Sequence, residues 1–309
     1  MNSLTESRTT SPTNAFESSA PLWQSAESRR RRRGGVSALM MALCALGLVV
    51  AFVPLVMLLG ELIVRGAPEL TATFFTALPQ SPSITQPNDI GGVSNAIIGS
   101  VALVVYASIL AVPLGIAVGV YLTEATSKLS TAVRLICHTM AGAPSILMGL
   151  FAFVVFFQYS NVRYTAIAGA FGLSVLMIPV IALSSEIALR TVPQSLREAG
   201  EALAAKPSRI MLSIVLPHAL PDVVGGVLLA VARAVGETAP ILLVIGGGYK
   251  NTWGLFQPVS ALPLTMFEGV KSQWPALRQQ VWGIGLVLVV FVFVVSITAR
   301  LWSSRATRS

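Results

Sequence analysis

Long apolar runs recur along the chain, and short polar or charged stretches separate them. A run of about 20 apolar residues is long enough for an α-helix to cross the hydrocarbon core of a bilayer. The pattern therefore predicts an all-α integral membrane protein with six transmembrane helices. The predicted spans are residues 36–64, 95–121, 135–159, 164–183 (continuing to 189), 220–245 and 282–301.

Proline and glycine interrupt two of these spans. Pro113 and Gly115 lie inside the second span, and Pro144 lies inside the third. Membrane helices tolerate such residues where neighbouring helices or water satisfy the backbone groups that are freed. We therefore expect a polytopic bundle around a pathway rather than a set of simple membrane anchors.

The composition is that of a membrane protein. Of the 309 residues, 54% are hydrophobic and only 11% are charged, whereas a soluble domain carries about 25% charged residues. The mean hydropathy is +0.75. The net charge of +8 does not indicate nucleic-acid binding, because the cations lie beside apolar runs and form no patch with interleaved aromatic residues. They have the distribution of charges that orient a membrane protein.

The same charges predict the orientation. Six spans place both termini on one side, and with the N-terminus inside, most of the 21 lysines and arginines fall in cytoplasmic segments. This is the bias of the positive-inside rule. We expect a multi-pass protein of the bacterial cytoplasmic (inner) membrane with cytoplasmic N- and C-termini. Segments 65–94 and 246–281 would then lie outside, where their proline and aromatic residues suit either docking of a partner or anchoring at the membrane interface.

The two ends of the chain differ from the spans. Residues 1–35 are predicted as a disordered basic cytoplasmic tail, because serine, threonine and glutamate dominate before five consecutive arginines at 29–33. A transmembrane domain is expected over 36–302, and a second cytoplasmic tail over 303–309. The apolar run 37–60 is too long for a typical signal peptide and no Ala-x-Ala site closes it, so an uncleaved first span is expected.

The sequence offers little chemistry of its own. The two cysteines and two histidines show no metal-ligand spacing, and no nucleophile lies near a candidate base. The glycine run 246–248 lacks the Gly-Lys-Ser/Thr ending of a phosphate-binding loop and is predicted outside. We expect a chain that is not an enzyme and binds no cofactor, so that energy must come from another subunit.

A polar segment over 190–217 joins the fourth and fifth spans on the predicted cytoplasmic side. Pro193 followed by alanine, glutamate and leucine is a good helix start, and Lys206 before Pro207 is a plausible stop. A second short helix is expected over 208–215. The simplest alternative is an ordinary amphipathic surface loop.

This segment resembles the EAA motif of the permeases of ABC importers, Glu-Ala-Ala-x3-Gly-x9-Ile-x-Leu-Pro. Two positions depart from it: glycine replaces the third alanine, and alanine replaces the glycine. Alanine at the glycine position is expected to straighten the turn between the two helices. The resemblance implies that the loop couples to an ATP-hydrolysing subunit. The residues at the positions of the motif are Glu198, Ala199, Gly200, Ala204, Ile214, Leu216 and Pro217.

The fifth predicted span contains the string Arg-Ala-Val-Gly-Glu-Thr-Ala-Pro, which begins at Arg233. Arg233 and Glu237 are four residues apart, hence on one face of a continuous helix. A charge near the middle of a span costs at least about 2.5 kcal/mol, so such residues usually face a cavity or a partner and are functional candidates.

The stretch 228–242 closely resembles the permeases of phosphate importers of the PstA type, and 142–151 is also similar to that family. The resemblance implies the type I ABC-importer permease (MetI-like) fold. It further implies three kinds of partner besides membrane lipid: a homologous second permease of the PstC type, an ATPase dimer of the PstB type that uses ATP and Mg, and an external phosphate-binding protein of the PstS type. One departure concerns Leu183, where the family pattern has an arginine before Ser184, Ser185 and Glu186.

Arg233, Glu237 and Thr238 are the candidate pathway residues. A guanidinium presents paired donors to a tetrahedral anion. Glu237 could temper this attraction and accept the proton that phosphate carries and sulfate lacks. The alternative is an intramembrane ion pair that only fixes helix packing. At the level of the whole protein, the alternatives are an importer of another oxyanion or small solute, and a stand-alone channel or carrier.

Overall fold

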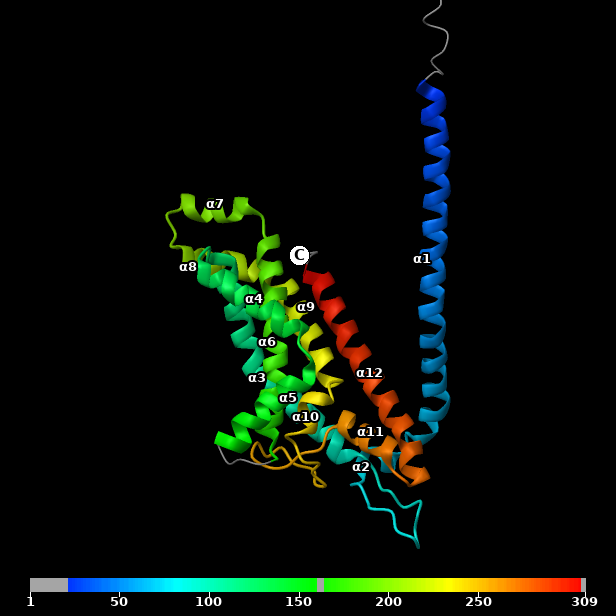
Figure 1. The fold of residues 1–309 in the computed structure, drawn as a ribbon. Helices are drawn as coiled ribbons and strands as arrows, with labels where there is room; N and C mark the ends of the chain where they lie inside the picture. Colours follow the sequence, from blue (N-terminus) through cyan, green and yellow to red (C-terminus); the bar gives the residue numbers. More distant parts are fainter. Residues whose placement is uncertain (1–21, 160–163, 307–309) are drawn as a thin grey trace, which may run out of the picture. The chain divides into compact units, whose positions relative to one another are not determined.

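The computed structural model describes residues 22–159 and 164–306, and helices dominate this part of the chain (Figure 1). The helical elements are α1 (Leu22–Gly66), η1 (Ala67–Glu69), α2 (Ala72–Thr76), α3 (Ser94–Glu124), α4 (Lys128–Gly142), α5 (Ser145–Phe153), η2 (Val154–Tyr159), α6 (Ala166–Thr191), α7 (Gln194–Ala202), α8 (Pro207–Ile210), η3 (Met211–Val215), α9 (Leu216–Val235), α10 (Ala239–Leu242), α11 (Leu262–Lys271) and α12 (Pro275–Ala306). The predicted all-α class is confirmed.

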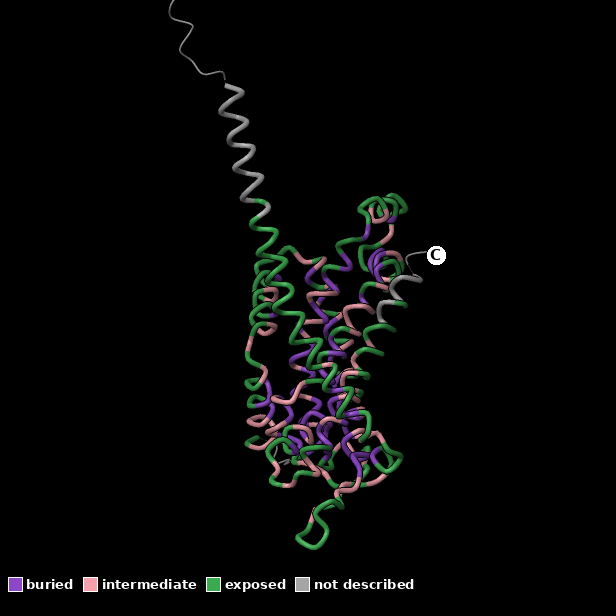
Figure 2. Tube along the Cα trace, turned by 90° about the vertical axis from the view of Figure 1, so that its right-hand side faces the viewer, coloured by how far each residue is buried: buried purple, intermediate pink, exposed green. Residues whose placement is uncertain are grey.

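Helix α6 is the centre of the bundle. Of its most apolar stretch 67% is buried, against 33% for α3, 28% for the span ending in α9 and 22% for α12. Helix α3 approaches α6 closely because Gly115 and Gly119 have no side chains: an added Cβ would lie 2.7 Å from Ile181 and 2.6 Å from Ser185. Small residues at such contacts are typical of membrane helix packing. The buried residues accordingly concentrate inside the bundle (Figure 2).

Five described helices are long and apolar enough to cross a membrane, and a bent pair makes a sixth span if it is counted as one. That pair corrects the predicted third span, 135–159. Helix α4 starts earlier, at Lys128, and ends at Gly142, and α5 departs from it at 104°. Ala143 precedes Pro144 and has extended backbone angles, which is the conformation that a following proline favours. The apolar run therefore continues while the helix does not.

The predicted fifth span, 220–245, is also broken. Helix α9 ends at Val235, and the four-residue helix α10 begins at Ala239. Gly236 occupies the C-cap of α9, and Pro240 lies in the first turn of α10. Proline removes a backbone donor and clashes with the preceding turn, so it favours a helix start over a helix interior. At its other end, the span begins at Pro207 rather than at 220.

Helices extend into both predicted terminal segments. Helix α1 begins at Leu22 rather than at 36, and α12 begins at Pro275 and continues to Ala306. Residues 22–35 and 303–306 are therefore helical, because arginine, alanine and glutamate extend an existing helix readily. The rest of the two predicted tails, 1–21 and 307–309, lies outside the described residues.

The chain divides into two units, Met1–Gly60 and Glu61–Ser309. In the first, nearly all described side chains of α1 from Leu39 onward are exposed and apolar. In the second, α7 and α8 lie at one end of the bundle and α2 and α11 at the other (Figure 1). We call these the α7 end and the α2 end.

Candidate functional site

The break between α9 and α10 holds the Arg233–Glu237 ion pair. Arg233 lies in the last turn of α9, and Glu237 lies in the non-helical link. The distance from Arg233 Nε to Glu237 Oε1 is 3.1 Å, and the two side chains are 45% and 17% exposed. The structure thus brings the two residues together, but at a helix end rather than along one face of a continuous helix. A cation at this end also interacts favourably with the terminal carbonyls of α9.

Most of the Arg233 guanidinium has no partner among the residues that the structure describes. Its Nε contacts Glu237, and within 22–159 and 164–306 no hydrogen bond engages Nη1 or Nη2. These two nitrogens carry four N–H donors in a planar fork. Such a fork can bind a tetrahedral oxyanion through two parallel hydrogen bonds.

The guanidinium lies on a face of α9 that is exposed among the described residues. Leu229, Arg233 and Gly236 are exposed, whereas Ala230, Ala234 and Val235 are buried. One face of α9 thus packs into the bundle while the face with Arg233 remains accessible. Thr238 follows at the N-cap of α10 and is partly buried, and its side chain makes no capping bond. Thr238 therefore lies beside the ion pair, and its hydroxyl does not cap the helix.

Helix α5 holds the far side of the break in place. An added Cβ at Gly149 would lie 2.7 Å from the carbonyl oxygen of Pro240 and 3.0 Å from that of Ala239, so only glycine permits this approach. Ile241, the next residue of α10, is buried in the main core. The two stretches that carry the sequence resemblance, 142–151 and 228–242, therefore meet in space.

A buried ion cluster at the α7 end was not predicted. Glu186 of α6 is 6% exposed, and its Oε1 accepts hydrogen bonds from Arg134 Nη2 at 2.7 Å and from Arg190 Nε at 3.1 Å. Both arginines also donate to the carbonyl oxygen of Leu122, at 3.0 and 3.2 Å. The cluster joins the end of α3 to α4 and α6. Two arginines thus pair with Glu186. This chain has Leu183 at the position where the family pattern has a further arginine.

The coupling segment forms the expected first helix, α7, after Pro193. The predicted second helix, 208–215, is not separate: it continues through η3 into α9, so that Pro207–Val235 is one span. Ile214, Leu216 and Pro217 therefore lie inside a helix rather than at its end. Gly200 is buried against Ile210, which an added Cβ would approach to 2.9 Å.

Arg197 connects helix α7 to the ends of α3 and α6. Arg197 Nη1 lies 2.7 Å from Glu124 Oε1 at the end of α3, and Arg197 Nη2 donates to the carbonyl oxygen of Leu189 at 3.4 Å. Glu198, Ala199 and Ala204 face outward and are exposed. The loop therefore presents a free surface while its inner side is connected to α3 and α6.

Ala204 keeps the turn after α7, contrary to the expectation that it straightens it. Its φ angle is +53°, the left-handed region that favours glycine, and its amide donates to the carbonyl oxygen of Glu201 at 2.8 Å. An alanine there is strained by about 1 kcal/mol. The fold of the loop overrides the preference of the residue.

The Ala204→Gly variant is therefore expected to be more stable by about 1 kcal/mol, because glycine adopts this conformation without the Cβ clash. Slower hydrogen exchange of the α7 amides would show the gain. Ala205→Gly, next in the chain and with no positive φ, is the control and should be neutral or destabilising. Equal effects of the two substitutions would contradict the strain at Ala204.

Comparison with known proteins identifies the family. The model of the family described as "Binding-protein-dependent transport system inner membrane component" matches residues 111–308. The chain is 34% identical over 241 residues to the phosphate transport system permease protein PstA of Xylella fastidiosa, covering 77% of this chain and 82% of that protein. It is 35% identical over 262 residues to PstA 1 of Mycobacterium tuberculosis, covering 84% and 86%.

Solved structures show the same fold. A chain of the methionine ABC transporter MetNI superimposes with a TM-score of 0.54 at 20% identity, covering 68% of this chain and 94% of that one. A chain of an amino acid ABC transporter gives a TM-score of 0.53 at 15% identity, covering 69% and 92%. The MetI-like permease fold expected from the sequence is confirmed. Family model, relatives and fold agree: the chain is a multi-pass membrane protein of the binding-protein-dependent transport system inner membrane components and belongs among the PstA permeases.

Proposed function

We propose that this chain is the permease subunit of an ATP-driven inorganic phosphate importer and forms half of its translocation pathway. The relatives named as phosphate transport permeases support this proposal. The observation that carries it is the break between α9 and α10, where Arg233 offers Nη1 and Nη2 on an uncovered face.

The break has a physical explanation in a pathway. Non-helical backbone at membrane depth is tolerated where protein buries it or where it lines a water-filled cavity. Core residues flank the break on both sides, Ala234 before it and Ile241 after it. A second homologous permease, of the PstC type, would cover the exposed face of α9 and enclose the aqueous route between the two subunits.

Energy coupling is assigned to the segment 190–217. An ATPase dimer of the PstB type, which binds ATP and Mg, would dock on the exposed side of α7, at Glu198, Ala199 and Ala204. Movement of α7 would reach the bundle through the Arg197–Glu124 contact at α3 and through the helix that continues from Pro207 into α9. Packed helices transmit such displacements as rigid bodies. This chain is then not itself an enzyme, and its termini and α7 are cytoplasmic.

Glu237 is assigned a role in selecting phosphate over sulfate. Its Oε1 holds Arg233 Nε, and no hydrogen bond to Oε2 occurs in the described ranges. At neutral pH phosphate carries a proton that Oε2 can accept, whereas sulfate carries none. Glu237 also reduces the net positive charge, so that a bound anion can leave.

The Glu237→Gln variant is expected to let sulfate inhibit phosphate uptake at about tenfold lower concentration, which corresponds to about 1.4 kcal/mol, near the lower end for a hydrogen bond to a charged group. The measurement is labelled phosphate uptake in the presence of increasing sulfate. Glu237→Asp keeps the carboxylate and should retain part of the discrimination. An unchanged uptake rate together with unchanged sulfate inhibition would remove Glu237 from the mechanism.

The function itself is tested by reconstitution. Vesicles containing this chain, its PstC-type and PstB-type partners and an external PstS-type protein should accumulate labelled phosphate only with Mg-ATP. Accumulation of another oxyanion or solute, with phosphate excluded, would support the alternative importer. Phosphate flux without nucleotide would support a channel or carrier.

A further inference from the structure

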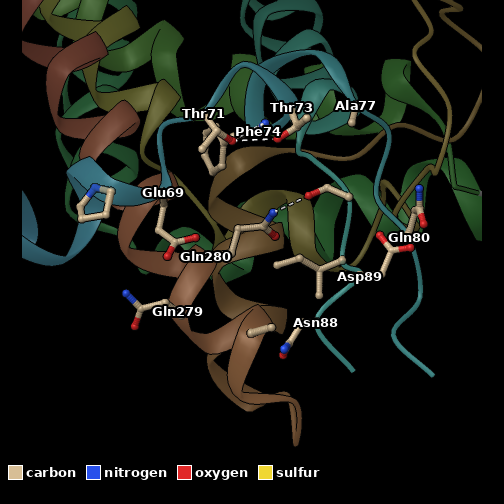
Figure 3. A pocket seen from close by; sticks show the side chains of 14 residues that line it. Glu69, Thr71, Thr73, Phe74, Ala77, Gln80, Asn88, Asp89, Gln279 and Gln280 are labelled. Carbon is tan, nitrogen blue, oxygen red and sulfur yellow. Dashed lines mark hydrogen bonds between the residues drawn. The ribbon is translucent and has the colours of Figure 1, made fainter. Parts of the chain in front are cut away.

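A polar cavity of about 520 Å³ opens at the α2 end of the bundle (Figure 3). Its walls come from the segment 68–91 and from the first turns of α12. The cavity is separate from the Arg233 site, which lies on α9. The lining residues are Pro68, Glu69, Thr71, Thr73, Phe74, Ala77, Gln80, Asn88, Asp89, Ile90, Gly91, Ala276, Gln279 and Gln280.

The lining is acidic and carries no lysine or arginine. Glu69 and Asp89 supply two carboxylates, and no ion pair within the described ranges neutralises either of them. Arg65, near the end of α1, is engaged elsewhere: it pairs with Glu61, and its guanidinium carbon lies 5.2 Å from the centre of the Trp282 ring. A negative cavity on a chain of net charge +8 therefore selects a cationic occupant.

The floor of the cavity contains a buried amide with a free acceptor. Gln280 is 5% exposed, and its Nε2 donates to the carbonyl oxygen of Gly91 at 3.1 Å (Figure 3). This bond fixes the amide, and its Oε1 has no hydrogen-bond donor among the residues that the structure describes. Gln280 Oε1 is not itself buried, so solvent reaches it from the cavity and it is available to an incoming donor. An N–H donor that enters the cavity would satisfy it.

The cavity is preorganised. Gly91 has φ +65°, and an added Cβ would lie 2.2 Å from the carbonyl oxygen of Leu78. Gln80 N donates to the carbonyl oxygen of Ile90 at 2.9 Å, so the two arms of the loop are paired. With the Gln80 amide turned so that Nε2 faces the carboxylate, it lies 3.0 Å from Asp89 Oδ2. Asp89 is therefore held in place before any partner arrives.

We infer that this cavity receives a lysine or arginine side chain from the external phosphate-binding protein. The inference rests on the proposed function, which places the α2 end outside. Two carboxylates and an amide oxygen match the several N–H donors of such a side chain. Among described residues no group of three or more histidine, cysteine, aspartate or glutamate side chains could hold a metal ion, which favours an organic cation.

The test uses the complete importer in vesicles, with purified external binding protein added at increasing concentration. The Glu69→Gln/Asp89→Asn double variant should raise the half-saturating concentration of binding protein about tenfold, because rim charges govern encounter and register. Its uptake rate at saturation should equal that of the unmodified importer. Added salt should weaken docking of the binding protein on the unmodified importer more than on the variant.

The matched control is Glu268→Gln on α11, an exposed carboxylate at the same end and outside the cavity lining. Although the residue is exposed, neighbouring atoms partly desolvate the Glu268 carboxyl and raise its pKa, so all comparisons are made near pH 8, where it is charged. The control should show the same half-saturating concentration of binding protein as the unmodified importer. An equal loss in the control and the double variant, or no loss in either, would overturn the inference.

Charge reversal identifies the occupant. Asp89→Lys should weaken docking further, and replacement of one basic residue on the binding protein by aspartate should restore it. If no such replacement restores docking while spermidine or calcium shifts the titration only when Glu69 and Asp89 are present, the occupant is a small cation and the inference is wrong. If the unmodified importer transports no phosphate, the proposed function fails instead.

Discussion

The Arg233→Ala variant is expected to lose phosphate uptake by about 100-fold or more while the transporter complex still assembles. The guanidinium supplies charge-assisted hydrogen bonds from Nη1 and Nη2, and loss of one partner of such a contact costs about 2–5 kcal/mol. Its contribution to folding is small, because the Arg233 side chain is 45% exposed and an exposed ion pair contributes about 1 kcal/mol at most. The measurements are labelled uptake in vesicles and the yield of intact complex.

Two further variants separate a pathway role from a packing role. Arg233→Lys keeps the charge but loses the planar fork, so it should retain intermediate activity. Leu229→Ala shortens an exposed apolar residue one turn earlier on the same face without removing a donor, so it should lower the yield of complex more than the uptake per complex. If Arg233→Ala lowers the yield of complex while the remaining complex transports phosphate at the normal rate, the ion pair serves helix packing and the phosphate mechanism is wrong.

The Glu186→Ala variant is expected to destabilise the bundle by about 1.5–3 kcal/mol, because it removes the charged acceptor that both arginines of the cluster share. Glu186 is the shared acceptor that joins α4 to α6, with Arg134 Nη2 at 2.7 Å and Arg190 Nη2 at 2.9 Å. A thermal unfolding curve of the detergent-solubilised complex should shift to lower temperature, and the yield should fall.

The cluster also predicts an order among its members. The side chain of Arg134 is 31% exposed and that of Arg190 is 54% exposed, so Arg134→Ala should be more destabilising than Arg190→Ala. Glu186→Gln keeps the shape and one acceptor, and should lose less stability than alanine. Unaltered unfolding of Glu186→Ala, or the reverse order of the two arginine variants, would contradict the structural role of the cluster.

The sequence predicts where apolar segments lie but not where they bend. A bilayer and a protein core both require apolar side chains, so a run such as 135–159 has the same composition whether it is straight or turns by 104° at Pro144. Gly236 and Pro240 were visible in the fifth span, yet membrane helices often contain such residues. The position of the break at Glu237 therefore follows from three-dimensional packing, such as the contact of α10 with Gly149, and not from the composition of the span.

The sequence predicts local pairs better than distant ones. Arg233 and Glu237 are four residues apart, and their proximity follows from short-range geometry. Glu186 and Arg190 are also four residues apart, so their spacing in the sequence indicates a contact in the same way. Arg134, however, is 52 residues from Glu186, and no local pattern relates the two. Similarly, the Arg197–Glu124 contact depends on how α7 returns to the end of α3.

One partner in the Glu186 cluster is not a side chain. Both arginines donate to the backbone oxygen of Leu122, one of the carbonyls that the end of α3 leaves without an intrahelical donor. Every amino acid presents that oxygen, so the contact itself does not constrain the side chain at position 122, whereas the full burial of Leu122 does. A motif search for this cluster should specify Arg134, Glu186 and Arg190 and require only an apolar residue at position 122.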